Sequence, residues 1–227
     1  MRSNEKDMKI NEYIEITNED NMEMMKRFPD NYFDLAIVDP PYRDEKDNAP
    51  TKQMRNNIGG KMKNFGNKPT QEYFTELFRV SKNQIIWGGN NFIENLYNTN
   101  CFIFWDKHNP VKNYSDGEFA WTSFTSVAKK FDFRYFGNHE GMTTKKETFH
   151  PTQKPIALYE WLLCNYAKEG DKILDTHLGS GSIAIALDSV NKIEKMNLTL
   201  TACELDIKYY ETSTKRVAGQ TNWISTF

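Results

Sequence analysis

The spacing of hydrophobic residues along this chain switches repeatedly between a pattern typical of strands and one typical of helices. This predicts strands that alternate with helices. Short apolar or alternating runs followed by turn residues are typical of strands, and they occupy 10–16, 35–38, 84–89, 101–105, 172–174 and 198–203. Apolar residues at helical spacing predict helices over 22–28, 70–80, 156–168 and 207–217, with another helix beginning at 183. This alternation indicates an α/β domain whose mostly parallel sheet is covered by helices on both faces.

Two stretches are less regular. Aromatic and β-branched residues predict strands over 119–126 and 126–135, which we expect to pair with each other in antiparallel fashion, and 223–227 suggests a last edge strand. In the final helix Asp206 is the expected N-cap, Gly219 the expected C-terminal break, and Ile207 one of the residues expected to face the core.

The most specific chemistry follows the strand that ends at Val38. The next residues are Asp39-Pro40-Pro41-Tyr42, and prolines prevent the strand from continuing because they fix φ and lack a backbone donor. The Asp39 carboxylate and the Pro40 carbonyl can accept both N–H bonds of a planar amino group while the Tyr42 ring covers its face. A strand followed by a stiff turn is the alternative interpretation.

Acidic residues follow several predicted strands, at Asp20, Asp39, Asp175 and Glu204. In parallel sheets, ligands bind at the carboxyl ends of the strands, so these acids predict one shared site. Asp20 could equally be a helix N-cap. Residues 175–182, Asp-Thr-His-Leu-Gly-Ser-Gly-Ser, join a strand to a helix, where glycines permit a tight turn and close approach of a ligand to backbone N–H groups.

A long segment, 43–69, separates the Asp39 strand from the next helix. Between 51 and 69 it is rich in asparagine and glycine and has basic residues but no acid. Long loops are usually functional or disordered. A basic loop directly after a site suits contact with phosphates and base edges, although a solvated loop is the plain alternative.

Composition adds few constraints. The 227 residues suffice for one domain with a substantial core, 38% are hydrophobic, and the net charge of −2 points to no particular partner. Cys101, Cys164 and Cys203 lie far apart without metal-ligand spacing, which favours a reduced, cytoplasmic protein without a metal. No apolar run is long enough to span a membrane, so no membrane association is expected.

Four motifs together resemble one family. They are DPPY at 39–42, HPTQKP at 150–155, DTHLGSGS at 175–182 and CELD at 203–206. They are similar to motifs IV, X, I and II of the β class of amino-group DNA methyltransferases that use S-adenosylmethionine, and small phage-type or orphan adenine enzymes in particular. The resemblance spans about residues 10–217. It implies a single methyltransferase domain, 1–227, with a Rossmann-like, circularly permuted sheet that contains one antiparallel strand.

The resemblance also implies roles. The catalytic half would be 10–135, including the basic loop 43–69, and the cofactor-binding half 150–219. Catalytic residues would be Asp39, Pro40, Pro41 and Tyr42. The adenine amine of the cofactor would be bound by Asp20, its ribose by Glu204, and its methionine and ribose end by Asp175, Thr176, His177, Gly179, Ser180 and Gly181. Thr152, Gln153 and Lys154 would lie near its carboxylate, with Lys154 as a point charge. The family usually has Asp-Pro-Phe where this chain has Asp175-Thr176-His177. The difference indicates a subtype of the family, and the alternative is that His177 is a site residue that tunes cofactor affinity.

The expected reaction is direct methyl transfer to an exocyclic amine, without a covalent enzyme intermediate, since no Pro-Cys pair exists for carbon-5 chemistry. The expected substrate is a flipped-out adenine in double-stranded DNA, because Asp at the first motif position is typical of adenine enzymes and Ser of cytosine enzymes. Cytosine N4, adenine in RNA, and an inactive DNA- or cofactor-binding protein are the alternatives.

Recognition of the target must fall to loops, because too few residues remain for a separate recognition domain. The candidates are 43–69, 106–118 and 136–149, with Lys52, Arg55, Lys61 and Lys63 as phosphate contacts. Trp121 and Phe124 could stack on the flipped base, although packing in the core is the more usual role of such residues. A short or relaxed target, or help from a second subunit in a homodimer, is expected.

Overall fold

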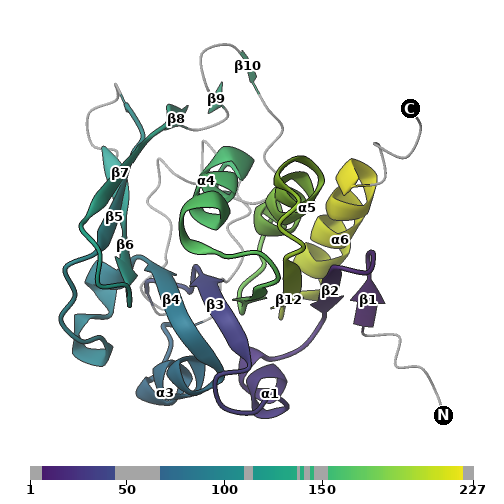
Figure 1. Ribbon diagram of the computed structural model, residues 1–227, viewed down its shortest axis with the longest axis horizontal. Helices are drawn as coiled ribbons and strands as arrows, with labels where there is room; N and C mark the ends of the chain where they lie inside the picture. The colour runs from purple at the N-terminus through teal and green to yellow at the C-terminus, as the bar shows by residue number, and fades with distance from the viewer. Residues whose placement is uncertain are drawn as a thin grey trace, which may run out of the picture.

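One nine-stranded sheet, covered by helices on both faces, forms the centre of the molecule (Figure 1). The computed structural model describes residues 7–43, 67–109, 115–136, 139–140, 144–145 and 153–221. The strands lie in the order β1 (Asp7–Lys9), β2 (Ile14–Thr17), β12 (Thr199–Cys203), β11 (Lys172–Asp175), β3 (Phe33–Val38), β4 (Ser81–Trp87), β6 (Gly117–Thr122), β5 (Phe102–Asp106) and β7 (Lys129–Asp132).

Two groups of helices cover this sheet, one on each face (Figure 1). One face carries α1 (Asn21–Lys26) and α3 (Gln71–Val80), and the other carries α4 (Ile156–Tyr166), α5 (Ser182–Glu194) and α6 (Ile207–Thr221). Two 3-10 turns, η2 (Gly89–Asn91) and η3 (Ile93–Asn95), follow β4. A small antiparallel sheet is formed by β8 (Tyr135–Phe136), β9 (His139–Glu140) and β10 (Thr144–Lys145).

The parallel part of the sheet brings the ends of five strands to one edge. The neighbours β2, β12, β11, β3 and β4 all run in the same direction. The expected antiparallel strand is β6, which pairs antiparallel with both β4 and β5, and β1 adds a short antiparallel pairing at the opposite edge. The predicted fold class is therefore confirmed, with carboxyl ends of parallel strands grouped where a ligand site is expected.

The two faces of the core explain why residues 35–38 of β3 are all apolar. Leu35 and Ile37 face the cluster under α4, α5 and α6, whereas Ala36 and Val38 face the cluster under α1 and α3, and all four are at most 1% exposed. A strand buried on both faces needs apolar residues at every position. Burying each large side chain contributes about 1.5–3 kcal/mol, and Ile37→Ala is expected to cost about 2–5 kcal/mol.

Three details of the predicted elements were wrong. The strands predicted over 119–126 and 126–135 do not pair with each other: β7 pairs parallel with β5, which lies between β7 and β6. The connection 123–128 is longer than a tight hairpin, and sequence pattern alone does not select the partner of a strand.

The other two concern α6. Asp206 does cap this helix, with Oδ1 accepting from the backbone N–H groups of Lys208 and Tyr209 at 2.8 and 3.1 Å. Ile207, however, is 50% exposed, because it occupies the first helical turn beyond the sheet edge. Gly219 does not end the helix, which continues to Thr221, since its backbone is not in the left-handed region that a glycine stop uses. The suggested strand at 223–227 lies outside the described residues.

Candidate active site

The four predicted acids lie at one edge of the sheet. Asp39 follows β3, Asp175 ends β11 and Glu204 follows β12, and these three strands are immediate neighbours. Asp20 follows β2, the next parallel neighbour of β12. The predicted grouping of carboxylates is thus present, and it results from parallel strand order rather than from sequence proximity.

Asp39 is held by two donors, one on each carboxylate oxygen. The Tyr42 hydroxyl donates to Asp39 Oδ1 at 2.6 Å, and the Lys154 ammonium donates to Asp39 Oδ2 at 2.5 Å. The Lys154 side chain is only 4% exposed and its Nζ lies 5.3 Å from the centre of the Trp87 ring. Burial and the nearby Asp39 carboxylate raise the pKa of the Tyr42 hydroxyl well above its ordinary value. The hydroxyl therefore stays protonated and donating.

Lys154 also contacts a residue that the sequence analysis did not identify. Its Nζ lies 3.1 Å from Glu118 Oε2, and Lys107 donates to Glu118 Oε1. Burial by itself would raise the pKa of Glu118, but Lys154 and Lys107 outweigh it and hold that pKa at about 2. Burial alone would lower the pKa of Lys154, which Asp39 and Glu118 instead raise. Both groups are therefore charged at neutral pH.

A glycine allows Tyr42 to reach Asp39. Gly88, directly after β4, has φ +66°, and a Cβ added to it would lie 2.2 Å from Tyr42 Cε1. Only glycine adopts this backbone conformation without strain and leaves room for the ring. Phe92 lies on another side of the Tyr42 ring, with ring centroids 6.2 Å apart. Tyr42 is therefore positioned by Gly88 and its surroundings as well as by the prolines.

Asp175 is the most deeply buried of the acids, at 2% exposed. Burial, followed by the nearby Asp39 and Glu204 carboxylates, raises its pKa to about 7, although the backbone N–H of His177 donates to Asp175 Oδ1 at 2.9 Å. An acid in this state titrates near neutral pH. It would gain most from a cationic ligand group, which supports its predicted place at the methionine end of a cofactor.

The glycine-rich turn packs closely against α6 and is tied to Glu204. Gly179 and Gly181 both have positive φ, and a Cβ on Gly181 would lie 2.7 Å from Val217 Cγ2 of α6. The backbone N–H of Gly179 donates to Glu204 Oε2 at 2.9 Å, which ties the turn to the end of the neighbouring strand. Burial raises the pKa of Glu204. Leu205, the next residue, exposes 66% of its surface beside this acid.

His177 joins three elements through a polar chain. Its Nε2 lies 3.1 Å from Asn21 Nδ2 at the start of α1, and its Nδ1 lies 2.9 Å from Thr176 Oγ1. Thr176 Oγ1 in turn lies 2.7 Å from the Tyr73 hydroxyl of α3. Burial lowers the pKa of His177 to about 4, so the ring is neutral, with Nε2 accepting from Asn21 and Nδ1 donating to Thr176.

Other predicted cofactor residues are placed less decisively. Asp20 caps α1, accepting at Oδ1 from the backbone N–H groups of Met22 and Glu23 at 2.9 and 3.3 Å. The N-cap alternative is therefore present, and its contact with a cofactor amine remains a prediction. Gln153 and Ser180 are buried. Thr152 lies outside the described residues. The Lys154 ammonium contacts Asp39, so its pairing with a cofactor carboxylate remains a prediction.

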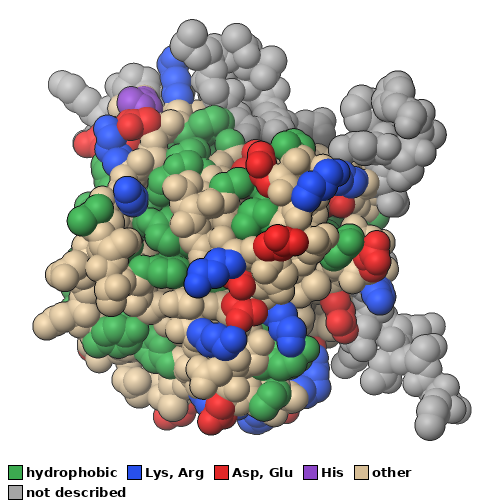
Figure 2. Space-filling view, viewed as in Figure 1, with side chains coloured by type: hydrophobic (Ala, Val, Ile, Leu, Met, Phe, Trp, Pro, Cys, Tyr) green, Lys and Arg blue, Asp and Glu red, His purple; other side chains and the backbone are tan. Residues whose placement is uncertain are grey.

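The predicted nucleic-acid contacts are mostly untested. Lys52, Arg55, Lys61 and Lys63 lie outside the described residues. Trp121 is 4% exposed and its Nε1 donates to the backbone carbonyl of Tyr97, so the structure favours core packing for it. Phe124 is half-buried and packs against Tyr166. On the face seen in Figure 2, described acidic and basic side chains are interspersed without a large patch of one sign.

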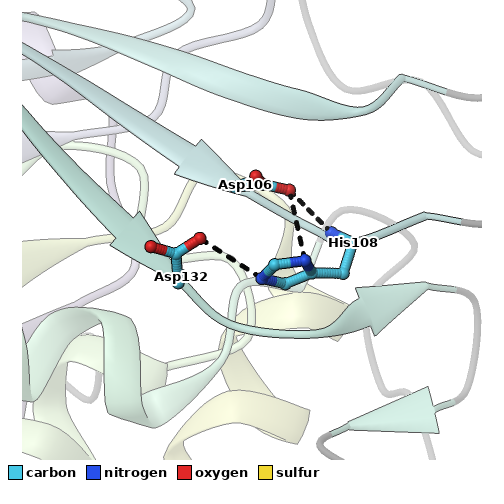
Figure 3. A group of neighbouring side chains, drawn as sticks. All are labelled: Asp106, His108 and Asp132. Carbon is cyan, nitrogen blue, oxygen red and sulfur yellow. Dashed lines mark hydrogen bonds and ion pairs between the residues drawn. The ribbon is translucent and has the colours of Figure 1, made fainter.

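A group of potential metal ligands lies at the ends of β5 and β7 (Figure 3). Asp106, His108 and Asp132 have ligand atoms within 4.8 Å of one another, but His108 and Asp132 are exposed. Lys130 Nζ already lies 2.8 Å from Asp132 and 3.6 Å from Asp106. The group is therefore a surface ion-pair network.

No helix of the described residues is both long and apolar enough to cross a membrane.

Several characterised proteins are similar in sequence. Type II methyltransferase M.HpaI of Haemophilus parainfluenzae is 27% identical over 208 residues, which cover 74% of this chain and 64% of that protein. Type II methyltransferase M2.MboI of Moraxella bovis is 24% identical over 209 residues, covering 73% of this chain and 75% of that protein. The chain thus matches slightly less than two thirds of the length of M.HpaI.

Solved structures share the fold. The complex of M1.HpyAVI with S-adenosylmethionine superposes with a TM-score of 0.56 at 22% identity, covering 89% of this chain and 99% of that one. PvuII DNA methyltransferase, which is cytosine-N4-specific, gives 0.57 at 13% identity, covering 94% and 93%. In addition, the model of the N6/N4 DNA methylase family matches residues 4–215. This match shows that the chain belongs to the amino-group DNA methylases.

Proposed function

We propose that this protein transfers a methyl group from S-adenosylmethionine to the exocyclic N6 amine of an adenine flipped out of duplex DNA. The observation that carries the proposal is the placement of Asp39 and Tyr42 at the end of β3, beside Asp175 and Glu204 at the ends of the next two strands. In this proposal the amine acceptor and the cofactor site share one sheet edge.

The residues present fit the cofactor. Gly181 lets the turn pack directly against α6, where a Cβ would lie 2.7 Å from Val217, Asp175 favours a cationic amine, and an acid at the position of Glu204 binds ribose hydroxyls in related folds. The exposed Leu205 side chain offers an apolar surface to the adenine ring. When bound, S-adenosylmethionine supplies a methyl group already activated on a sulfonium.

The residues of the chain then provide alignment and electrostatics. Asp39 and the Pro40 carbonyl accept the two N–H bonds of the target amine, which favours a more pyramidal nitrogen whose lone pair points at the methyl group. The Tyr42 ring covers the face of the base. Transfer would form the N–C bond from the amine lone pair and break the C–S bond, whose electron pair returns to sulfur. Asp39 would stabilise the positive charge on the nitrogen until one proton passes to solvent. Positioning of this kind supplies much of the barrier reduction.

Adenine is proposed over cytosine because of the residue at position 39. Aspartate, which accepts from an amine, is typical of the adenine enzymes of the family at this position. Serine is typical of the cytosine enzymes. The shared fold does not distinguish the two, since the PvuII enzyme is cytosine-N4-specific. The target sequence and contacts by the 43–69 segment remain predictions.

The test is to incubate the protein with labelled S-adenosylmethionine and unmethylated duplex DNA, digest the DNA and identify the labelled nucleoside. We expect N6-methyldeoxyadenosine. Label in N4-methyldeoxycytidine would show that the target base is cytosine and not adenine. Label in RNA alone, in a parallel reaction, would show that the substrate is RNA and not DNA. Cofactor binding without any transfer would indicate an inactive binding protein.

A further inference from the structure

Glu118 reaches the active site through the one reversed strand in that part of the sheet. β6 runs antiparallel to β4, with Ala120 opposite Trp87. The beginning of β6 therefore lies at the same edge as the carboxyl ends of β3 and β4. Glu118 precedes Ala120 by two positions and so lies on the same face of the sheet, just beyond Trp87. The reversed strand thus adds an acid to an edge otherwise formed by parallel strands.

The contacts form an alternating chain of donors and acceptors. Lys107 donates to Glu118, Glu118 lies 3.1 Å from the Lys154 ammonium, and Lys154 donates to Asp39 at 2.5 Å. Tyr42 completes the chain by donating to the other oxygen of Asp39. Two lysines and two carboxylates alternate along it, so their formal charges balance.

The position of the Lys154 ammonium depends on both acids. It lies 2.5 Å from Asp39 Oδ2, 3.1 Å from Glu118 Oε2 and 3.5 Å from the Tyr42 hydroxyl. Without the Glu118 charge, the ammonium would be attracted to Asp39 alone. It would then interact with Asp39 more strongly than it does now, and Asp39 would offer less negative charge to the target amine and to the positive charge that develops on it.

We propose that Glu118 is a positioning residue for methyl transfer: it shares the Lys154 ammonium with Asp39, and so limits how strongly Lys154 draws on the carboxylate that is to accept from the target amine. This role rests on the proposed function of the Asp39 site. It assigns to Glu118 no contact with DNA or cofactor, so its removal slows transfer without weakening cofactor binding.

The first experiment compares the wild-type protein with Glu118→Gln in single-turnover methyl transfer and in cofactor binding. We expect the transfer rate constant of Glu118→Gln to fall at least tenfold, with the cofactor Kd changed less than threefold. Glu118→Asp, which keeps the charge, should recover part of the rate. Glu23→Gln removes a glutamate paired with an exposed lysine, Lys26, and should match the wild type. An unchanged rate in Glu118→Gln, or equal losses of rate and cofactor affinity, would overturn the proposal.

A second measurement does not depend on activity. In protein labelled with ¹⁵N at lysine side chains, the buried Lys154 ammonium should give a slowly exchanging signal, identified by its loss in Lys154→Met. It should shift in Glu118→Gln and Glu118→Asp but not in Glu23→Gln. An unmoved signal would refute the Glu118–Lys154 contact even if the wild type transferred no methyl group. If the wild-type protein transfers no methyl group but the Lys154 signal does shift in the Glu118 variants, the contact is real and the proposed function is refuted. A role of Glu118 in transfer is then refuted with it. If Glu118→Gln does not fold, the signal and rate of Glu118→Asp decide.

Discussion

The Lys154 ammonium lies 2.5 Å from Asp39 Oδ2, although the two residues are separated by 115 positions in the sequence. Asp39 belongs to the motif proposed to be catalytic, and Lys154 to the motif expected to bind the cofactor. Their contact links the two halves of the proposed site directly. It also gives Asp39 a buried counter-charge in surroundings that include Glu118 and Asp175.

Lys154→Met is therefore expected to impair both stability and catalysis. Removing one partner of a buried ion pair costs about 3–5 kcal/mol, which chemical denaturation would measure. Asp39 would lose the positively charged donor that contacts its Oδ2, and with it a contact that orients the carboxylate. The single-turnover rate of methyl transfer should therefore fall at least about tenfold.

Lys26→Met is the matched control for this variant, because Lys26 is exposed and pairs only with Glu23 among the described contacts. It should leave both the stability and the rate of methyl transfer within experimental error of the wild type. A Lys154→Met protein that transfers methyl groups at the wild-type rate would show that the ammonium does not position Asp39.

Gly88→Ala should displace Tyr42. The new methyl group would lie 2.2 Å from the ring at a backbone φ of +66°, and the left-handed conformation alone costs an alanine about 1–2 kcal/mol. A shift of about 1 Å in a positioning residue lowers rates roughly 100-fold. Gly219→Ala, inside α6 with no atom within 4 Å of its Cβ, should instead stabilise the protein by about 0.5–1 kcal/mol. Equal activity of the two variants would contradict the account of Tyr42.

Cofactor binding should depend on pH through Asp175. Its pKa is raised to about 7, and a cationic amine binds the ionised form. Affinity should therefore be full above pH 7 and fall up to about tenfold per pH unit below it. Calorimetry across pH 5.5–8.5 would measure this dependence. Asp175→Asn should bind more weakly at pH 8 and lose the dependence, whereas a wild-type affinity that is constant with pH would argue against this contact.

His177→Phe should destabilise the protein by about 1–3 kcal/mol at pH 7, because Asn21 and Thr176 lose a buried partner. The pKa of His177 is lowered to about 4, so the neutral ring favours the folded state above pH 6.5. This contribution is lost as pH falls toward 4. The stability difference between wild type and His177→Phe should therefore shrink over that range in denaturation experiments. A difference that grows would contradict a buried neutral histidine.

The sequence predicted the parts of the site that lie at the carboxyl ends of parallel strands. Asp39, Asp175 and Glu204 each follow a buried apolar run, and parallel pairing places them together. Glu118 could not be found in this way, because it begins a strand whose reversed direction depends on pairing with β4 and β5.

Other differences have equally local causes. The partner of β7 depends on strand order, which residue pattern does not encode. Gly219 was expected to end α6, but a helix tolerates a glycine when its backbone keeps helical angles. Ile207 was assigned to the core by spacing alone, although the first turn of α6 extends beyond the sheet edge. Pattern identified the elements, whereas their neighbours and ends required tertiary contacts.

The measurement that tests the central claim most directly compares wild type, Asp39→Ala and Asp175→Ala in the same two assays, cofactor binding and methyl transfer to duplex DNA. We expect Asp39→Ala to bind S-adenosylmethionine within about threefold of wild type while transfer falls at least about 1000-fold. Asp175→Ala should bind at least about tenfold more weakly. Transfer by Asp39→Ala at the wild-type rate would contradict the assignment of this sheet edge as the site of methyl transfer.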